Sequence, residues 1–413
     1  MNFQEIINRV NDLNEWIINI RRDIHETPEL AMEEFITKAK IKKYLDEIGI
    51  EYKEFESHRG IMAYIIKNPS YKTIAIRADI DALPITEQNN KPYKSKDDGI
   101  MHACGHDAHT AMLIGACKVL YDIKDDLKVN VKFFFQGAEE RFGGAKYLIK
   151  DKCLQNPKVD YMFGLHVQSN VEKGYIECKE GTLNASSNSV KIRIKWKRAH
   201  GAYPEKGIDA LVCAAQVITS LQSIISRNLS PSNMAVLTLG KISGGEAQNI
   251  ICEDVEINGT IRYLNEESKK FIMDRAKSIV ENTSKAYGCK GDIYMESQGY
   301  PQVINDKELV DIVKFNSERL LGKDTYKEKA YPSMGAEDFS FYTENCKGVF
   351  FHLGCGNDEK GINSLIHTDT FDIDEDCLVI GTSIHVLNVI YFNEKEWVLA
   401  EYKYSHIKLI YYV

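Results

Sequence analysis

The pattern of apolar and polar positions changes character twice along the chain. Up to about residue 186 and again after about 300, amphipathic helical patterns alternate with short runs that are almost entirely apolar, typical of buried parallel strands. Between these stretches, residues 189–196 alternate apolar and polar side chains with period two, which favours half-exposed antiparallel strands. The pattern therefore predicts an α/β protein: a mainly parallel-sheet domain (1–186 and 300–413) interrupted by an inserted domain (187–299).

The predicted elements of the outer domain put polar residues at the ends of buried strands. An amphipathic helix ends near His25, a second helix covers about 33–48, and later helices cover about 307–321 and the segment after Asp374. Strands are predicted at 61–67, 73–77, 129–135, 161–165 and 349–353, followed in three cases by Asp79 and Asp81, by Glu139 and Glu140, and by His166. Open α/β sheets gather their active sites at these carboxyl ends.

The inserted segment follows a different order. A strand at 189–196 precedes a helix at about 209–226, and strands at 234–242 and 255–262 precede a helix at 266–287 and a last strand at 291–297. This βαββαβ order predicts a ferredoxin-like domain.

Residues 101–109 concentrate side chains that can bind metal. Cys104 and His106 stand two positions apart, and both can face one cation only if Gly105 forms a turn. A buried helix follows, so these side chains lie at a positive helix end, which favours a thiolate. A lone cysteine or histidine is usually structural, but three histidines and a cysteine in nine residues indicate half of a metal site.

Glu140, His166 and His367 supply the other half. Together with Cys104 and His106 they offer one thiolate, one carboxylate and three imidazoles, too many for one closed tetrahedral ion. This number suits two ions that share a bridging ligand. The neighbouring carboxylate, Glu139, then remains to move a proton between the attacking water and a leaving nitrogen.

Composition limits the partners. The 413 residues carry a net charge of −8, which argues against nucleic acid as the main partner. The first twenty residues include charged side chains within a helical pattern, so we expect neither a signal peptide nor a membrane span, and a cytoplasmic protein. The ten cysteines are scattered and are expected to be mostly reduced and buried. The aromatic tail from Glu396 has no assigned role.

Ordered motifs along residues 15–385 resemble the dinuclear metal aminoacylase and carboxypeptidase family. Within it they are most similar to the amidohydrolase branch, which includes auxin-conjugate hydrolases, hippurate hydrolases and N-acetyl-diaminopimelate deacetylases. The motifs are RRDIH at 21–25, PEL at 28–30, RADIDALP at 77–84, MHACGHD at 101–107, FQGAEE at 135–140, HGA at 200–202, Gly244 and Gly245 with Asn249, GTIR at 259–262, MGAEDF at 334–339, and His367.

The resemblance implies roles for individual residues. Cys104 bridges two metals, His106 and His166 complete one metal site, and Glu140 and His367 complete the other. Glu139 is the general base. The inserted domain is a lid that also forms a dimer, His200 reaches across to stabilise the oxyanion, and Asn249 and Arg262 hold the substrate carboxylate. Asp79 makes no metal bond, and Asp81 orients a ligand from behind.

The sequence thus predicts a metal-dependent amidohydrolase that cleaves N-acyl amino acids, N-acetyl or aryl-acyl, as a homodimer with two divalent ions. Zn²⁺ suits the imidazoles and thiolate, whereas Mn²⁺ suits the carboxylate. The alternatives are a dipeptidase or carboxypeptidase with the same machinery, and a metal-binding scaffold without catalysis. We expect a small-molecule substrate, and neither a nucleic acid nor a membrane as partner.

Overall fold

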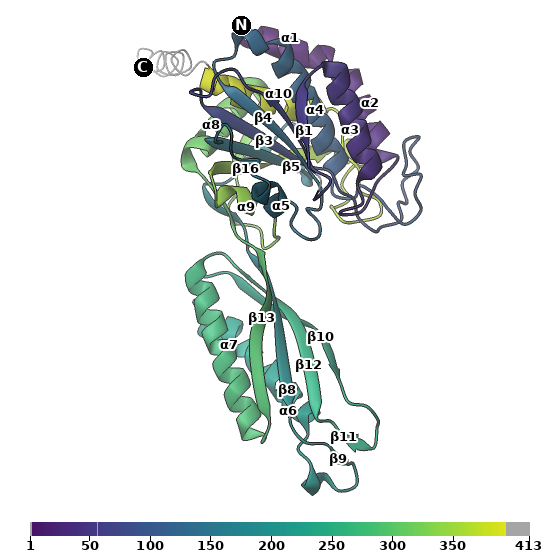
Figure 1. Ribbon diagram of the computed structural model, residues 1–413, viewed down its shortest axis with the longest axis vertical. Coiled ribbons are helices and arrows are strands. Elements are labelled where there is room, and N and C mark those ends of the chain that lie inside the picture. Colours follow the sequence, from purple (N-terminus) through teal and green to yellow (C-terminus); the bar gives the residue numbers. More distant parts are fainter. Residues whose placement is uncertain (1, 56, 394–413) are drawn as a thin grey trace. The chain divides into compact units, whose positions relative to one another are not determined.

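The chain divides into two compact units, which are described separately (Figure 1). The computed structural model describes residues 2–55 and 57–393, so the aromatic tail from Glu396 lies outside the described residues. Unit 1 comprises Met1–Gly181, Ile304–Ala330 and Phe341–Val413, and unit 2 comprises Thr182–Val303 and Tyr331–Ser340. The predicted inserted segment, 187–299, lies within unit 2, which also takes in 331–340.

Unit 1 contains an eight-stranded sheet in the order β1-β2-β4-β3-β5-β16-β6-β15. The four central strands, β4, β3, β5 and β16, are parallel to one another, which confirms the predicted α/β class with a mainly parallel core. The strands are β1 (Glu51–Glu54), β2 (Ile61–Ile65), β3 (Thr73–Asp79), β4 (Asn130–Gln136), β5 (Tyr161–Glu172), β6 (Ile176–Cys178), β15 (Tyr326–Glu328) and β16 (Lys347–Gly356).

Helices cover both faces of this sheet, as the side chains of β4 show. Phe133 and Phe135 join the main hydrophobic core together with apolar residues of α4, whereas Phe134 points the other way and packs on Tyr342, with ring centroids 5.8 Å apart. The helices are α1 (Phe3–Asp12), α2 (Asn14–His25), α3 (Phe35–Ile48), α4 (His106–Asp122), α5 (Ala145–Lys150), α8 (Lys307–Leu321), α9 (Ser340–Thr343) and α10 (Cys377–Asn393).

Helix α4 is buried on nearly every side, because it is apolar all round and packs against α2, α10 and the sheet. The predicted turn precedes it: Gly105 adopts a left-handed φ of 84° at the helix N-cap. A Cβ at this position would lie 2.3 Å from Cγ2 of Val167, so only glycine fits both the backbone and the space.

Two predictions about element boundaries are wrong. The N-terminal pattern forms two helices that meet at Leu13, and this break lets both α1 and α2 keep their apolar residues in the core. His166 does not follow the end of its strand but lies inside β5, because pairing with β16 continues to Glu172. The strand β5 is therefore longer than its apolar run, because its backbone continues to pair with β16 after the run ends.

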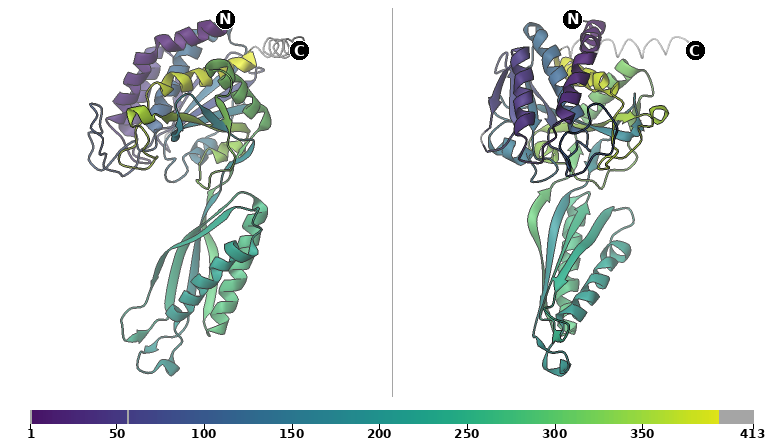
Figure 2. Two further views of the ribbon diagram at one scale, coloured as in Figure 1. Left: turned by 180° about the vertical axis from the view of Figure 1, so that it is seen from behind. Right: turned by 90° about the vertical axis from the view of Figure 1, so that its right-hand side faces the viewer.

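Unit 2 has a four-stranded antiparallel sheet in the order β10-β12-β8-β13. In chain order the strands and helices alternate as βαββαβ, and both helices cover one face of the sheet (Figure 2), so the ferredoxin-like prediction is confirmed. The elements of unit 2 are β8 (Ser187–Lys195), α6 (Ala210–Ser223), β10 (Ala235–Gly244), β12 (Asp254–Tyr263), α7 (Glu266–Ala286) and β13 (Lys290–Tyr300), with the short pair of β9 (Ala199–His200) and β11 (Ile250–Ile251). The chain also has a short pair of β7 (Gly181–Asn184) and β14 (Val303–Asn305).

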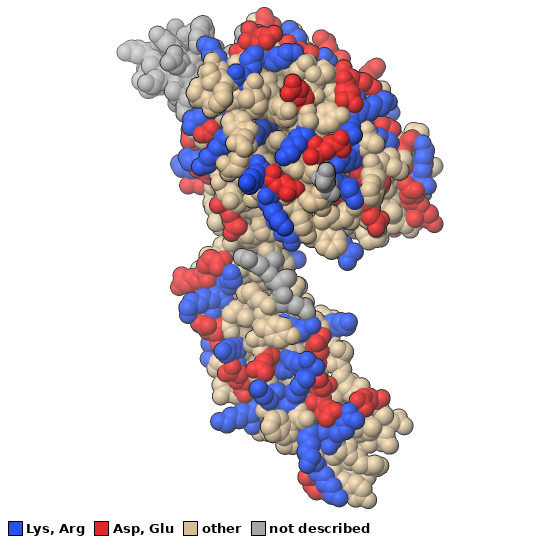
Figure 3. All heavy atoms as spheres, in the orientation of Figure 1, with Lys and Arg blue, Asp and Glu red and all other residues tan. Residues whose placement is uncertain are grey.

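The surface of unit 2 includes an apolar part of α6. The stretch Ala210–Asn228 is long and apolar enough to cross a membrane by length and composition, and 33% of it is buried in unit 2. Leu211 and Val212 are about half exposed near its start. Elsewhere, basic and acidic side chains are mixed across the visible face of each unit (Figure 3). All ten cysteines are free, and all but Cys346 are buried.

Candidate metal centre

The three parallel strands β4, β3 and β5 lie side by side, and their carboxyl ends meet the start of α4. Asp79 is the last residue of β3, and Glu139 and Glu140 follow β4 directly after a short turn. Because parallel strands end on one edge of the sheet, residues distant in sequence come together there.

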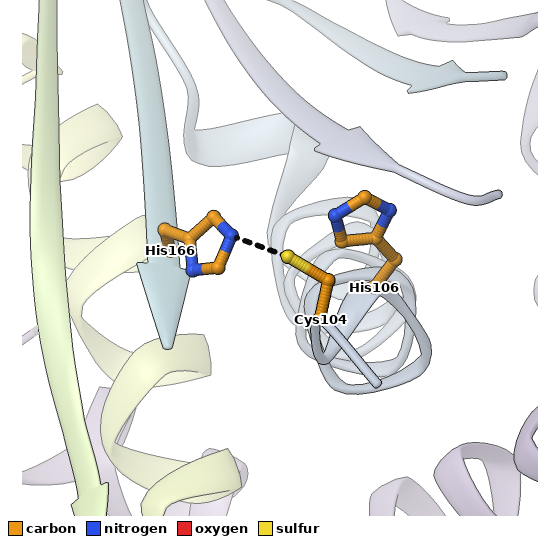
Figure 4. A group of neighbouring side chains, drawn as sticks. All are labelled: Cys104, His106 and His166. Carbon is orange, nitrogen blue, oxygen red and sulfur yellow. Dashed lines mark hydrogen bonds between the residues drawn. The ribbon is translucent and has the colours of Figure 1, made fainter. Parts of the chain in front are cut away.

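Cys104, His106 and His166 form a first group whose ligand atoms all lie within 4.8 Å of one another. Figure 4 shows the His166 ring pointing at the Cys104 sulfur, and the distance from Nε2 to Sγ is 3.2 Å. Nδ1 of His166 donates to the carbonyl of Val167 at 2.7 Å, which fixes the ring with Nε2 facing the sulfur. This group could hold one metal ion.

A second group consists of Cys104, Glu140 and His367, whose ligand atoms also lie within 4.8 Å of one another. It shares the Cys104 sulfur with the first group. Nε2 of His367 lies 3.3 Å from that sulfur and 3.2 Å from Oε1 of Glu140. The loop that carries His367 is held at this point, because the His367 amide donates to the Ala103 carbonyl at 2.8 Å while its φ is 62°. All five predicted ligands therefore lie together, with the thiol between the two groups.

The atoms in these groups fit divalent cations. Nε2 of His106 and Oε1 of Glu140 are buried and make no hydrogen bond of normal geometry to a described residue, although charged partners lie 3.5 Å away at Asp79 Oδ2 and 3.2 Å away at His367 Nε2. Buried polar atoms are otherwise nearly always paired. Histidine nitrogen, thiolate sulfur and carboxylate oxygen are ordinary ligands of Zn²⁺ and related ions. The chemistry of the donors thus supports two metal ions.

The electrostatics point the same way. Burial, together with the carboxylates of Glu140, Glu139 and Asp79, raises the pKa of the Cys104 thiol well above its usual value. Burial lowers the pKa of His106, but Asp79, Asp81 and Glu140 outweigh it and raise that pKa to about 10. Burial and these carboxylates thus oppose the effect of the helix end on the thiol. The excess of negative charge favours bound cations, which would stabilise the thiolate.

Glu139 belongs to a third group, with His106 and Glu140, whose ligand atoms also lie within 4.8 Å of one another. Its side chain is buried at 7% exposure, whereas the side chain of His367 is 49% exposed. The centre is thus enclosed on the side of α4 and the sheet and open on the side of His367. A reacting group could enter there and meet the Glu139 carboxylate.

Asp81 connects two of the predicted ligands. Its Oδ1 lies 3.3 Å from Nδ1 of His106, and its Oδ2 accepts a hydrogen bond from the Glu140 amide at 3.0 Å. Carboxylates behind metal-binding histidines fix the orientation of the ring. The contacts suit the orienting role predicted for Asp81.

Asp79 lies beside the centre, with its Oδ2 3.5 Å from Nε2 of His106, and it also binds two residues that have no predicted role. His109 accepts a hydrogen bond from the Val167 amide at Nε2, so its Nδ1 donates to Asp79 at 2.6 Å. The Arg77 guanidinium donates to the other Asp79 oxygen at 2.8 Å. Burial would raise the pKa of Asp79, but Arg77 and the two histidines lower it well below its usual range. Asp79 also forms a group with His106 and His109 whose ligand atoms lie within 4.8 Å of one another, so the expectation that Asp79 makes no metal bond stays a prediction.

A buried ion network also anchors the start of α4. Asp107, next to His106, accepts hydrogen bonds from Arg21 and His25 at 2.7 Å each, and all three side chains are buried. Arg21 and His25 belong to the 21–25 motif, so their presence in the motif was the available signal. Their role in holding the helix could not be inferred without knowing that α2 packs on α4.

The three predicted site residues of unit 2 are separated within that unit. His200 and Asn249 lie together, because β9 pairs with β11 and the Gly201 amide donates to the Asn249 carbonyl at 2.7 Å. Arg262 stands near the far end of β12, where Nη1 donates to the Met334 carbonyl at 2.8 Å. From Asp254 to Arg262 a strand extends roughly 26 Å. Unit 2 thus does not bring Asn249 and Arg262 together within one chain.

The chain is similar to known proteins over most of its length. The model of peptidase family M20/M25/M40 matches residues 75–389. The chain is similar to the N-acetyl-L-cysteine deacetylase of Bacillus subtilis, at 38% identity over 92% of this chain and 89% of the relative. It is also similar to thermostable carboxypeptidase 2 of Saccharolobus solfataricus, at 35% identity over 95% and 99% of the two chains.

A solved structure shows the same fold. The crystal structure of a dinuclear metal-binding peptidase of the M20 family from Bacillus subtilis superposes with a TM-score of 0.80, at 34% identity over 92% of this chain and 99% of that one. The family prediction drawn from the motifs is therefore confirmed, and the chain belongs to peptidase family M20/M25/M40.

Proposed function

We propose that this protein is a metal-dependent amidohydrolase that cleaves the amide bond of N-acyl amino acids, with an acetyl or aryl-acyl group, to give a carboxylate and an amino acid. One observation carries the proposal: two groups of ligand atoms share the Cys104 sulfur, and Glu139 lies beside them with its carboxylate in the same cluster. The deacetylase relative, named for an N-acetyl amino acid, supports this class of substrate.

Cys104 would bridge two ions, with His106 and His166 on one and Glu140 and His367 on the other. Two divalent ions in such a site activate water and polarise an amide carbonyl. Glu139 accepts the proton of the attacking water and delivers it to the leaving nitrogen, so that the amine departs neutral. Asp81 holds His106 and the Glu140 backbone in place during the reaction. Mn²⁺ and Zn²⁺ both suit this set of ligands.

The residues of unit 2 would act on the substrate from two chains. Because His200 and Asn249 lie together and Arg262 lies at the other end of β12, one chain cannot place all three on a small substrate. We propose a homodimer through unit 2, in which His200 donates to the oxyanion and Asn249 joins Arg262 of the other copy on the carboxylate. The exposed Leu211 and Val212 of α6 supply apolar surface for this contact. The proposed location is the cytoplasm.

A second candidate is hydrolysis of small peptides. It is favoured by the relative named thermostable carboxypeptidase 2, which matches almost the whole chain. The same proton transfer by Glu139 would cleave a peptide bond, so the chemistry of the centre does not separate the two candidates. The difference lies in what occupies the acyl side of the scissile bond.

The test is amine release from metal-stripped protein reloaded with Mn²⁺ or Zn²⁺. The substrates are N-acetyl, N-benzoyl and indole-acetyl amino acids, with dipeptides and N-blocked dipeptides as the matched panel. We expect metal-dependent release from at least one acyl amino acid at a higher kcat/KM than from any peptide. A preference for peptides would favour the second candidate, and metal binding without release from any substrate would indicate a scaffold without catalysis.

A further inference from the structure

A buried carboxylate outside the five predicted ligands contacts the loop that carries Glu139 and Glu140. Glu34 precedes α3, is fully buried, and accepts a hydrogen bond at Oε1 from the Ala138 amide at 2.8 Å. Its other oxygen, Oε2, makes no hydrogen bond to a described residue. Glutamate side chains are mostly exposed to solvent, so the burial of Glu34 against this loop is unusual.

Glu34 is free to point inward because another residue caps its helix. The carboxylate of Glu29 accepts hydrogen bonds from the amides of Ile36 and Thr37 at 2.9 and 2.8 Å, the place where a capping side chain normally binds. Glu34 makes no capping bond with its own side chain. The stability of α3 therefore does not require the Glu34 carboxylate.

The loop needs an external contact because its backbone is in an unfavourable region. Ala138 has a φ of 60°, a left-handed conformation that costs a residue with a Cβ roughly 1 kcal/mol or more. Both sides of the residue are bonded: its amide donates to Glu34 and its carbonyl accepts from the Gly144 amide at 3.0 Å. The next two residues are Glu139 and Glu140, so the turn at Ala138 decides where both carboxylates point.

The Glu34 carboxylate fills the space next to Gly137, the first residue of the loop. A Cβ built on Gly137 would lie 2.6 Å from Oε1 and 2.9 Å from Cδ of Glu34, closer than atoms in contact allow. The glycine at 137 therefore leaves room for the carboxylate to reach the Ala138 amide. A side chain at 137 would require the Glu34 carboxylate to move from this position.

We propose that Glu34 is a positioning residue for the reaction, which holds Ala138 in its left-handed conformation and thereby directs Glu139 and Glu140 toward the metal ions. Asp81 fixes the far end of the same loop through the Glu140 amide. Glu34 touches neither the proposed ligands nor a substrate and acts only through the backbone. The inference rests on the proposed roles of Glu139 and Glu140.

The experiment compares Glu34→Ala, Glu34→Gln and Gly137→Ala in the full-length, metal-loaded protein. Glu33→Ala is the matched control, since Glu33 is the same residue type one position away and is exposed. Each variant is assayed for kcat and KM, and separately for metal affinity by titration of the stripped protein. The titration reads the position of Glu140 without any substrate, so it distinguishes a failure of this inference from a failure of the proposed activity.

We expect Glu34→Ala to lower kcat and to weaken the binding of one of the two metals by about 10- to 100-fold, with a much smaller change in KM, the scale of losing a residue that orients a ligand. Glu34→Gln should retain most of kcat, because its amide oxygen can accept the same hydrogen bond. Gly137→Ala should resemble Glu34→Ala. The double variant should lose no more than either single one, because both changes break one bond.

Wild-type kcat and metal affinity in Glu34→Ala, or in Gly137→Ala, would overturn the inference. So would additive losses in the double variant. If Glu34→Ala does not fold, the inference is tested by comparing Gly137→Ala with Glu34→Gln. Both variants keep a polar side chain at position 34, but only Gly137→Ala displaces that side chain from the Ala138 amide.

Discussion

The two units present their candidate residues in opposite ways. In unit 1 the five predicted ligands and Glu139 lie on four separate segments, yet their atoms are mutually close, and only His367 is substantially exposed. In unit 2 His200 and Asn249 are exposed, and Arg262 lies at the other end of a long strand. The candidate residues of unit 1 thus gather within one chain, whereas those of unit 2 are spread along it. The roles proposed for them, chemistry and substrate recognition, would place different demands on the fold.

The largest effect should come from the base in the enclosed centre. Glu139→Gln keeps the size of the side chain but cannot accept the proton, so kcat should fall by ~10²-fold or more. Both metals should remain bound, because Glu139 is not one of the proposed ligands. Steady-state kinetics and elemental analysis of the same sample test this. Activity near that of the wild type would remove Glu139 from the proposed role.

The exposed residues of unit 2 allow a test of the second chain. His200→Ala should lower kcat by ~10²- to 10³-fold, the usual range for loss of one oxyanion donor. If His200 serves the other copy, mixing His200→Ala with Glu139→Gln should restore about a quarter of the wild-type rate. Half of the dimers then contain one chain of each variant. In such a dimer one of the two sites combines an intact Glu139 from one chain with an intact His200 from the other.

Mixing either inactive variant with itself is the control for this recovery. No recovery after the subunits have exchanged would mean that His200 acts within its own chain or not at all. Exchange itself can be followed with differently tagged chains, so an absence of mixed dimers is not mistaken for an absence of complementation.

An intermediate effect on metal affinity or activity is expected from a change at Asp81, which contacts His106 and the Glu140 amide. Asp81→Asn keeps the size of the side chain but replaces one acceptor with a donor, so it cannot serve both His106 and the Glu140 amide. Metal affinity or activity should fall by ~10- to 100-fold. Titration with Zn²⁺ against the exposed control Asp98→Asn measures the loss. Equal affinity in the two variants would contradict an orienting role.

The contrast between the units also explains what the sequence could predict. The ligand types were visible, and so was the place of Glu140 just after an apolar strand, because strand periodicity and the 101–109 motif are local features. The ferredoxin-like order was visible for the same reason. These local patterns indicated the fold class of both units and the candidate ligands of the metal centre.

Contacts between segments that are distant along the chain could not be predicted from the sequence. His109 is the last residue of the 101–109 motif, but its bonds to Asp79 and to the Val167 amide depend on how α4 packs on β3 and β5. Glu34 looks like a surface residue of an amphipathic helix until the 137–140 loop is placed against it. His166 was placed past a strand end because the length of β5 is set by its partner β16.

The smallest effect on turnover, and a distinct effect on stability, is expected from Glu34→Gln. Burial, with a smaller contribution from Asp81, raises the pKa of Glu34 to about 7 from an ordinary 4.5. The folded chain then binds this proton more tightly than the unfolded chain does. The free energy of unfolding of the metal-free protein should fall as pH rises from about 4.5 to about 7, and this contribution should stay constant above that range.

Glutamine cannot ionise, so Glu34→Gln should remove that part of the pH dependence and stabilise the metal-free protein above pH 7 by roughly 3 kcal/mol. Denaturant unfolding at pH 5 and pH 8 in a chelating buffer, with Glu33→Gln as control, measures the difference. An identical pH dependence in wild type and Glu34→Gln would mean that Glu34 is not the titrating group. A stabilised variant that also binds metal normally would show that the hydrogen bond, and not the charge, positions the loop, and that unit 1 tolerates a buried ionisable group at a cost in stability.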